Sequence, residues 1–416
     1  MIKLLIAADD FTGALDTGVQ FSKQGIRTLV VPSAETDMEN VDGSIVVLSV
    51  NTQTRHKNKK EAYETVYRLI KRAADMGIKY IYKKTDSALR GNIGSELLAA
   101  IRGSGYDRLM FIPAYPDNNR TTENGAQYIS GAPIAQTHFA NDPFNPVSTS
   151  YIPDIIKQQT DVHTIIVKTG ETAEYSEQCG IFIFDAKTNE DISNICHILK
   201  RSNEIRLMAG CAGCANALPE VIDFKKSAQE PSGFRGSILL VSGSLNNTSI
   251  EQMNHAKNIG FTGVTLSPEQ MLKRDYIKSY ECDLLVNRIN GYLAENKRAY
   301  IETADGATDI KNCRQYIVDN NTDTDMPHLL IARNIGNLVK RIINERQVSN
   351  LFVFGGDTLL GIIEALDIKG VTPLSEICPG VVASKILSEK YSFNLITKAG
   401  GLGPKDAVGI TMAKVL

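Results

Sequence analysis

The chain has 416 residues, more than one hydrophobic core usually sustains, so two domains are expected. Its 43% hydrophobic and 22% charged residues are typical of a globular protein and exclude a disordered or collagen-like chain. The formal net charge of −2 provides no global field for nucleic acid or an anionic membrane, so neither is expected as a partner.

The compartment is predicted from cysteine usage and from the first residues. Seven cysteines, an odd number without the dense spacing of a secreted disulfide scaffold, favour a reducing environment. The apolar start, residues 1–8, is too short for a signal peptide, and no later segment reaches the length of a membrane helix. A cytoplasmic protein is therefore expected.

The first half of the chain alternates between predicted strands and helices. The predicted strands cover residues 2–8, 28–31, 44–50, 80–84, 108–113, 164–168 and 180–184, and the predicted helices cover 14–24, 59–76, 93–102 and a segment ending near 201. Such alternation is typical of a mainly parallel sheet with helices on both faces. Residues 114–150 lose the periodicity, so an extended connection with little regular structure is expected there.

A linker-like stretch at residues 225–236 divides the chain into predicted domains 1–228 and 229–416. The second half repeats the alternation, with predicted strands at 237–242, 263–266, 299–303 and 350–354 and predicted helices at 248–259, 280–297, 328–345 and 358–366. The expected fold class is α/β, with two domains that each contain a mainly parallel sheet flanked by helices. Ligands collect at the carboxyl edge of such sheets, where loops follow the strands.

The first polar loop is Asp9-Asp10-Phe11-Thr12-Gly13. Two adjacent acids after a buried strand would repel each other, so they should face hydroxyls, a metal or a cation. Alternatively, Asp10 or Thr12 only caps the next helix. A cap needs one side chain, which favours a functional role for Asp9.

The second polar loop follows the predicted strand at residues 80–84. It contains Lys84, Asp86, Ser87, Arg90, Gly91 and Asn92. Its cations suit a carboxylate, which Arg can bind bidentately, and its other polar groups suit hydroxyls. Gly91 permits close backbone approach, and a helix start favours an anion. A polar surface loop is the alternative.

Three further loops could hold a phosphate in the second domain. They carry Ser244, then Gly355, Gly356, Asp357 and Thr358, then Gly400, Gly401 and Gly403 after Lys398. Glycine-rich turns let backbone amides surround a polyphosphate. None matches the Walker or dinucleotide patterns. The residues alone therefore leave a nucleotide site and ordinary turns or caps as equal alternatives.

At these loops the sequence resembles the four-carbon acid sugar kinase family over almost the whole chain. The resemblance rests on residues 6–14 with Asp16, on 83–94, on 113–116 with Arg120 and Thr121, on 242–244, on 355–358 and on 398–403. It departs from the family at Asn119 and at residues 210–213, which puts details of the connecting loop in question. Residues 16–20 are closer to the threonate and erythronate branch than to the 3-oxo-tetronate branch.

The resemblance implies an ATP-dependent kinase that phosphorylates the C4 hydroxyl of D-threonate or D-erythronate in a cleft between the domains, with Mg²⁺ bridging the phosphates. By resemblance, the acid is bound by Asp9, Arg55, Lys84, Asp86, Ser87, Arg90, Gly91 and Asn92. By resemblance also, ATP is bound by Ser244, Gly355, Gly356, Asp357, Thr358, Gly400, Gly401 and Gly403. Asp86, Asp9 and Asp357 remain alternatives for the catalytic base, and the metal ligands stay open.

Three alternatives to this function are retained: a 3-oxo-tetronate kinase, a non-catalytic sugar-acid sensor, and an oxidoreductase or epimerase acting on the same acid. The last is disfavoured because the dinucleotide fingerprint is absent. A homodimer is one alternative for the oligomeric state.

Overall fold

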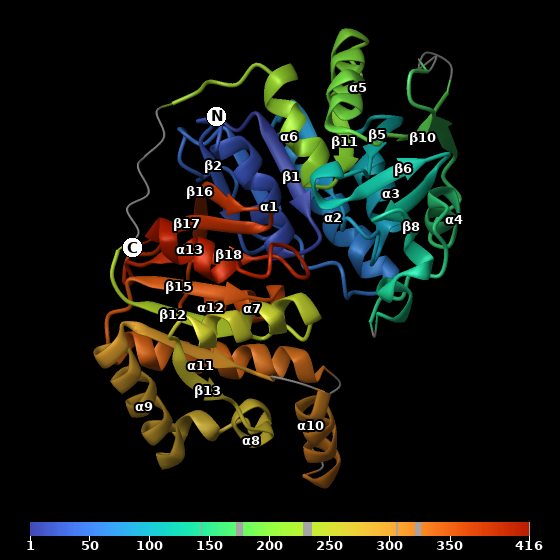
Figure 1. Ribbon diagram of the computed structural model, residues 1–416. Helices are drawn as coiled ribbons and strands as arrows, with labels where there is room; N and C mark the ends of the chain where they lie inside the picture. The colour runs from blue at the N-terminus through green and yellow to red at the C-terminus, as the bar shows by residue number, and fades with distance from the viewer. Residues whose placement is uncertain (143, 172–177, 228–234, 305–306, 321–325, 416) are drawn as a thin grey trace. The chain divides into compact units, whose positions relative to one another are not determined.

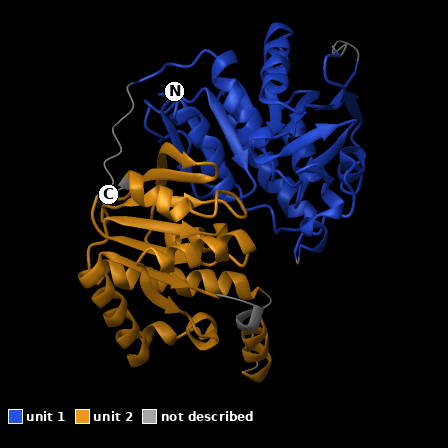
Figure 2. Ribbon diagram, viewed as in Figure 1, with its two compact units in different colours: residues 1–229 blue, residues 230–416 orange. Residues whose placement is uncertain are grey.

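The computed structural model describes residues 1–142, 144–171, 178–227, 235–304, 307–320 and 326–415 (Figure 1). The chain divides into two compact units, Met1–Gln229 and Glu230–Leu416 (Figure 2). Part of the expected linker and the expected boundary, at residues 228–234, lie outside the described residues. No helix in the described part of the chain is long and apolar enough to cross a membrane.

Unit 1 is built on an all-parallel sheet with the strand order β2-β3-β1-β4-β11-β5-β10-β9. The strands are β1 Leu4–Ala8, β2 Thr28–Val31, β3 Val47–Asn51, β4 Tyr80–Lys84, β5 Arg108–Ile112, β9 Thr164–Val167, β10 Gly180–Phe184 and β11 Leu207–Gly210. The helices are α1 Phe11–Ser22, α2 Lys59–Asp75, α3 Ile93–Ser104, α4 Ile152–Lys157, α5 Asn189–Arg201 and α6 Ala212–Val221. The expected parallel α/β architecture is confirmed, but strand β11 and helices α4 and α6 were not predicted from the sequence.

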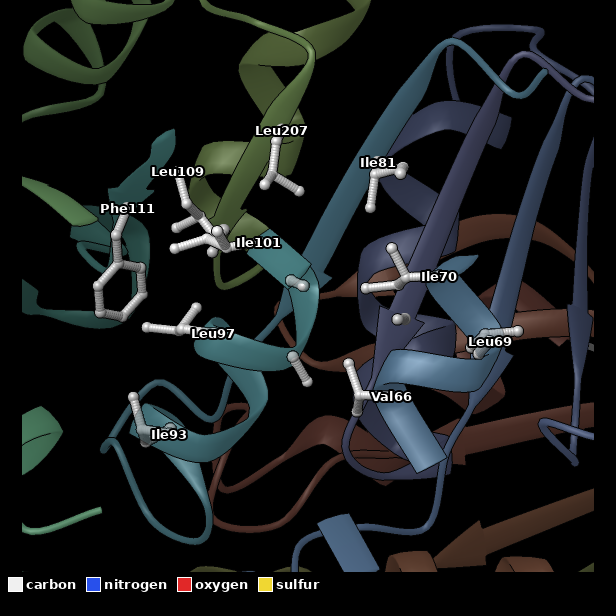
Figure 3. Close-up of a cluster of buried hydrophobic side chains, with 14 of the residues drawn as sticks. Val66, Leu69, Ile70, Ile81, Ile93, Leu97, Ile101, Leu109, Phe111 and Leu207 are labelled. Atoms are coloured by element: carbon white, nitrogen blue, oxygen red, sulfur yellow. The ribbon is translucent and has the colours of Figure 1, made fainter. Parts of the chain in front are cut away.

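Successive strand residues of unit 1 enter two different cores. Ile81 of β4 packs with Val66 of α2 and Leu97 of α3 in one core, which Figure 3 shows with neighbouring side chains. Tyr82, the next residue, packs in the other core with Phe21 of α1 and Leu218 of α6. Because strand side chains alternate between faces, helices on both faces require strands that are apolar throughout.

Residues 114–150 contain more regular structure than expected. They form a three-stranded antiparallel sheet of β6 Arg120–Glu123, β7 Ala126–Ile129 and β8 Ala132–Pro133, and the 3-10 turns η1 Pro116–Asn118, η2 Ile134–Gln136 and η3 His138–Asn141. Asn124 and Gly125 join the first two strands with φ of 49° and 73°. An Asn-Gly pair with positive φ at both positions is a strong hairpin signal, which the sequence reasoning overlooked.

Unit 2 contains a second sheet with the order β13-β14-β12-β15-β18-β17-β16. Its strands are β12 Ile238–Ser242, β13 Thr262–Thr265, β14 Arg298–Glu302, β15 Asn350–Phe354, β16 Gly370–Cys378, β17 Val381–Leu387 and β18 Asn394–Lys398. Its helices are α7 Asn247–Asn258, α8 Pro268–Leu272, α9 Tyr280–Asn296, α10 Ala307–Asp319, α11 Pro327–Glu345, α12 Gly356–Ala365 and α13 Ala407–Val415, with the 3-10 turn η4 Tyr276–Lys278. The strands are parallel except at β17, which runs antiparallel to both β16 and β18.

One face of the unit 2 sheet is covered by α7 and α13. Phe352 and Phe354 of β15 and Ile396 of β18 pack there against Met253 of α7 and Val408 of α13. Lys398, two residues after Ile396, continues the same side of β18 because strand side chains repeat every second residue. The last residue of β18 is thus directed to the layer that contains α7.

Candidate functional site

In unit 1, charged side chains gather at the carboxyl end of three neighbouring strands. Asp9 follows β1, Lys84 ends β4 and Arg55 comes shortly after β3. These strands are adjacent and parallel in the order β3-β1-β4, with Ala8 paired to both Asn51 and Lys84. Residues far apart in the sequence therefore meet at one edge of the sheet, as expected for a ligand site in this fold.

Arg55 lies at the centre of a group we call the acid–guanidinium cluster, comprising Asp9, Asp10, Arg55, Asp86 and Arg90. Its Nε donates to Asp9 Oδ2 at 2.8 Å, and Nη1 and Nη2 donate to the two carboxylate oxygens of Asp10 at 3.0 and 2.9 Å. Burial opposes ionisation of Asp10, but the charges of Arg55 and Lys84 lower its pKa overall. Asp10 also caps α1 by accepting from the Gly13 amide at 2.9 Å. Both interpretations of Asp10, cap and charge partner, therefore hold.

Asp86 is held by the loop that follows β4. Arg90 donates to its two oxygens from Nε at 2.9 Å and Nη2 at 3.0 Å, and the Ala88 and Arg90 amides add bonds of 3.2 and 3.3 Å. Burial disfavours the charge of Asp86, but Arg90 and Arg55 hold its pKa well below the usual range. Asp86 is therefore a stable carboxylate with little capacity to accept a proton.

Two polar groups in this region retain open bonding capacity. Asp9 Oδ1 is buried and has no hydrogen-bond partner among the described residues, whereas Oδ2 is held by Arg55. The Lys84 ammonium donates to the Thr85 carbonyl at 2.8 Å and has two further N–H groups. It lies beside the start of α1, where a Cβ added to Gly13 would be 2.9 Å from Nζ. A ligand could therefore find an oxygen acceptor and a cation together.

The remaining predicted residues of the second loop shape it. Gly91 has φ +86°, and a Cβ there would approach the Arg55 carbonyl to 3.2 Å, so a side chain would be strained and crowded. The Asn92 amide nitrogen donates to the carbonyls of Thr54 and Lys57 at 2.9 and 2.8 Å and ties this loop to the one that carries Arg55. Ser87 is half-buried, and its carbonyl accepts from Gln127 at 3.3 Å.

Sequence reasoning missed one partner of the acid–guanidinium cluster and one buried ion pair of β4. Asp142, from the 114–150 segment, accepts from Arg90 Nη1 at 3.1 Å. Lys83 and Glu96, both buried, form an ion pair of 2.7 Å on the α3 side of β4. A lysine near the end of a strand, followed by a glutamate in the first turn of the next helix, is a weak sequence signal for such a pair. No sequence pattern marks Asp142, because its segment has no periodicity.

In unit 2, the three glycine-containing loops follow three neighbouring parallel strands. Ser244 follows β12, Gly355 follows β15 and Gly400 follows β18, and these strands are adjacent in the order β12-β15-β18. A Cβ built on Gly355 would be 3.6 Å from the Ser244 amide nitrogen, and one built on Gly401 would be 3.0 Å from the Asn246 side chain. The three loops therefore come together at one edge of the sheet.

The backbone of these loops fits an anion. Gly355 and Gly403 have φ of +103° and +88°, which favour glycine. Gly355 is the N-cap of α12, and no side chain caps the amides of that first turn, to which Gly356, Asp357 and Thr358 belong. The start of α7 is occupied instead by its own cap, Asn246. The open amides at a helix N-terminus can bind phosphate oxygens.

The side chains of the site also bear on whether a metal ion could be bound. Among the described residues, no group of three or more His, Cys, Asp or Glu side chains could hold a metal ion. Asp357 is exposed and lies in the loop that follows β15, one of the three glycine-containing loops, which we call the phosphate-type loops. This arrangement fits Mg²⁺ held through phosphate oxygens and one carboxylate, as is usual in nucleotide enzymes.

The geometry defines an α/β protein with a buried carboxylate and cation site in one unit and an anion cradle in the other. Two family models match the sequence of this chain: "Sugar-binding N-terminal domain" over residues 4–218 and "Nucleotide-binding C-terminal domain" over residues 239–408. The chain belongs to the four-carbon acid sugar kinase family.

Relatives of known name span nearly the full chain. A D-threonate kinase of Salmonella typhimurium is 28% identical over 97% of this chain and 96% of its own length. A D-erythronate kinase of Heliobacterium modesticaldum is 24% identical over 98% and 95%. A crystal structure from Salmonella typhimurium LT2 covers 99% of both chains with a TM-score of 0.81 at 19% identity, which shows a shared fold.

Proposed function

We propose that this protein transfers the γ-phosphoryl group of ATP to the C4 hydroxyl of D-threonate or D-erythronate. The observation that carries the proposal is that two neighbouring strands, β1 and β4, end in an open carboxylate oxygen on Asp9 and in the Lys84 ammonium at the carboxyl edge of unit 1. The chemistry matches a polyhydroxy acid, which needs a cation for its carboxylate and acceptors for its hydroxyls. Domain 1–228 would bind the acid and domain 229–416 the nucleotide.

The roles of the carboxylates follow from their partners. Asp9 Oδ1 accepts the proton of the attacking hydroxyl, since Asp86 is already bound through both oxygens. Lys84 binds the substrate carboxylate through the N–H groups that it does not use on Thr85. Arg55 and Arg90 hold the acids in place, and Ser87, Gly91 and Asn92 keep the loop close to the substrate.

The phosphate chain of ATP would lie on Ser244, on Gly355, Gly356, Asp357 and Thr358, and on Gly400, Gly401 and Gly403. Phosphoryl transfer depends mainly on positioning and on charge neutralisation, which backbone amides supply. Mg²⁺, when bound with the nucleotide, would neutralise phosphate charge, with Asp357 as its protein ligand. That the reaction takes place between the two domains stays a prediction, as do the homodimer and the cytoplasmic location.

A coupled assay of ADP release over a panel of four-carbon acids tests this function. D-threonate and D-erythronate should give the highest kcat/KM, and NMR of the product should show phosphate on C4. Highest activity with 3-oxo-tetronate would assign the other branch. Binding of an acid without ADP release would indicate a sensor and overturn the proposed activity.

A further inference from the structure

Lys398 is a fully buried lysine whose partners among the described residues are a hydroxyl and an aromatic ring. Its Nζ donates to Ser249 Oγ of α7 at 2.6 Å and lies 5.1 Å from the centroid of the Phe354 ring. No carboxylate of the described residues forms an ion pair with it. A buried ammonium without a counter-ion is costly, so a folded protein retains one only where something offsets that cost.

Ser249, the hydrogen-bond partner of Lys398, contacts two of the phosphate-type loops. Ser249 accepts from Lys398, so its own proton is directed elsewhere: Ser249 Oγ lies 2.9 Å from Ser244 Oγ and 3.4 Å from the Gly400 carbonyl. Lys398 is therefore two hydrogen bonds away from the Ser244 hydroxyl. The three side chains form a continuous path from the buried charge to the surface of the cradle.

The hydrogen-bonding role of Ser244 follows from the shorter of the two Ser249 contacts. Ser249 has one proton, and Ser244 Oγ at 2.9 Å is a nearer acceptor than the Gly400 carbonyl at 3.4 Å. A serine hydroxyl has one donor and two acceptor lone pairs. Ser244 Oγ accepts from Ser249 at 2.9 Å and from the Asn246 amide at 3.4 Å, which occupies both lone pairs. Its remaining capacity is the donation of its own proton. A phosphate oxygen is an acceptor without protons to give, so it is the complementary ligand.

We propose that Lys398 is a positioning residue for the nucleotide phosphates, which holds Ser244 as a donor through Ser249 and takes up a proton when the phosphates bind. The inference rests on the proposed nucleotide site in this unit and goes beyond it by assigning the charge that balances the phosphates. Phosphate oxygens at Ser244 would be the missing counter-ion of the buried lysine.

The electrostatic surroundings of Lys398 allow this protonation step. Burial lowers the pKa of Lys398 to about 7, and no neighbouring charge contributes to that shift. The elements packed around it carry several titratable groups. On α7, Glu251 pairs with Lys405, Lys257 pairs with Glu302 and His255 lies against Gly409. On α13, Lys414 donates to the Ile377 carbonyl, and β17 and α12 carry Lys385 and Asp357. An arriving anion would favour the charged lysine and raise its pKa.

Calorimetric titration of the full chain with ADP and Mg²⁺, at pH 6.5 to 9 in buffers of different ionisation enthalpy, tests the proposal. The readout is the number of protons taken up per ADP bound, compared with Lys398→Met and Ser249→Ala. The matched control is Lys414→Met on α13, a lysine whose Nζ donates to the Ile377 carbonyl at 2.7 Å. Thermal denaturation confirms that each variant is folded.

We expect wild type and Lys414→Met to take up more protons than Lys398→Met, with the largest difference about half a pH unit above the pKa of Lys398 in the nucleotide-free protein. The wild-type Kd should rise about 10-fold over this pH range, which corresponds to a pKa increase of about one unit. In Lys398→Met this part of the pH dependence should disappear, and KM for ATP should rise more than kcat falls. Ser249→Ala should weaken ADP binding at every pH.

Equal proton uptake in wild type and Lys398→Met would overturn the inference and leave the nucleotide site intact. A wild-type protein that does not bind ADP at all would overturn the proposed nucleotide site, and the inference with it. The two failures are thus distinguishable by whether binding heat is present.

Discussion

Arg90 holds Asp86 through both carboxylate oxygens, at 2.9 and 3.0 Å, while its third nitrogen contacts Asp142 at 3.1 Å. An Arg bound in this way has no free face for a second bidentate carboxylate. Arg90 would have to release Asp86 to orient a substrate carboxylate, as the sequence had suggested. We therefore assign that role to Lys84, whose ammonium has open donors, and treat Arg90 as support for the loop.

Asp9→Asn should lower kcat by about 10³-fold, because an amide cannot accept the hydroxyl proton. The dissociation constant for ADP should change by less than about 2-fold, since the nucleotide loops belong to the other unit. Steady-state kinetics and calorimetry measure the two quantities.

Asp86→Asn is the comparison variant. It should also lower turnover more than ATP affinity, but by releasing Arg90 and loosening the loop, with a fall in melting temperature that Asp9→Asn does not show. Unchanged turnover in Asp9→Asn would remove Asp9 from the chemistry.

Gly243→Ala should abolish measurable nucleotide binding. A Cβ at this position would lie 1.9 Å from Thr358 Oγ1 and 3.1 Å from Thr358 Cβ, so the Thr358 hydroxyl must leave its position and the two loops must separate slightly. The control is Gly291→Ala in α9, where a Cβ would meet nothing within 4 Å. Fluorescence titration with a labelled ADP compares the variants. Wild-type affinity in Gly243→Ala would show that the two loops do not act as one cradle.

Lys83→Met should destabilise unit 1 by about 3 to 5 kcal/mol, because it leaves Glu96 buried without its partner. Replacing both residues, Lys83→Met with Glu96→Leu, should recover most of that loss, since a buried ion pair adds little over apolar packing. Urea denaturation followed by a probe in unit 1 gives the free energies of unfolding. A double variant as unstable as the single one would argue that Glu96 has a further role.

Lys398→Met should stabilise the nucleotide-free protein at neutral pH. Burial holds the pKa of Lys398 at about 7, below the ordinary lysine value of about 10.5, so the unfolded chain binds more protons between these values. Wild-type stability therefore rises with pH across this window. The advantage of Lys398→Met, on the order of 4 kcal/mol at pH 7, should shrink towards pH 10. Denaturation curves at several pH values check the trend, and an advantage that grows with pH would contradict it.

The sequence was a good guide to most of the parallel strands, although β11 and β18 were missed, and a poor guide to segments without periodicity. Strands such as Asn350–Phe354 are apolar runs that end in turn residues, so their bounds are readable. The strands β16, β17 and β18 were missed because Ser, Lys and Thr interrupt their apolar pattern. Helix α6 was missed for another reason: its small residues and Pro219 hide the helical period.

The candidate site was readable as a set of residue types but not as a set of partners. Lys84, Asp86 and Arg90 stand together in the sequence, so a charged loop was predicted. Which oxygen is taken and which is open depends on Arg55, 46 residues from Asp9, and on Asp142, 52 residues from Arg90. Such pairings depend on strand order, which single-sequence patterns do not specify.

Tyr82, Lys83 and Lys84 occupy consecutive positions of β4 and serve an apolar layer, a buried ion pair and the ligand site in turn. Because neighbouring strand residues face opposite sides, adding or deleting one residue in β4 would exchange the sides of all three. Both the layer and the site would fail at once. Evolution can therefore substitute residues at these positions of β4, but it cannot insert or delete a residue in the strand.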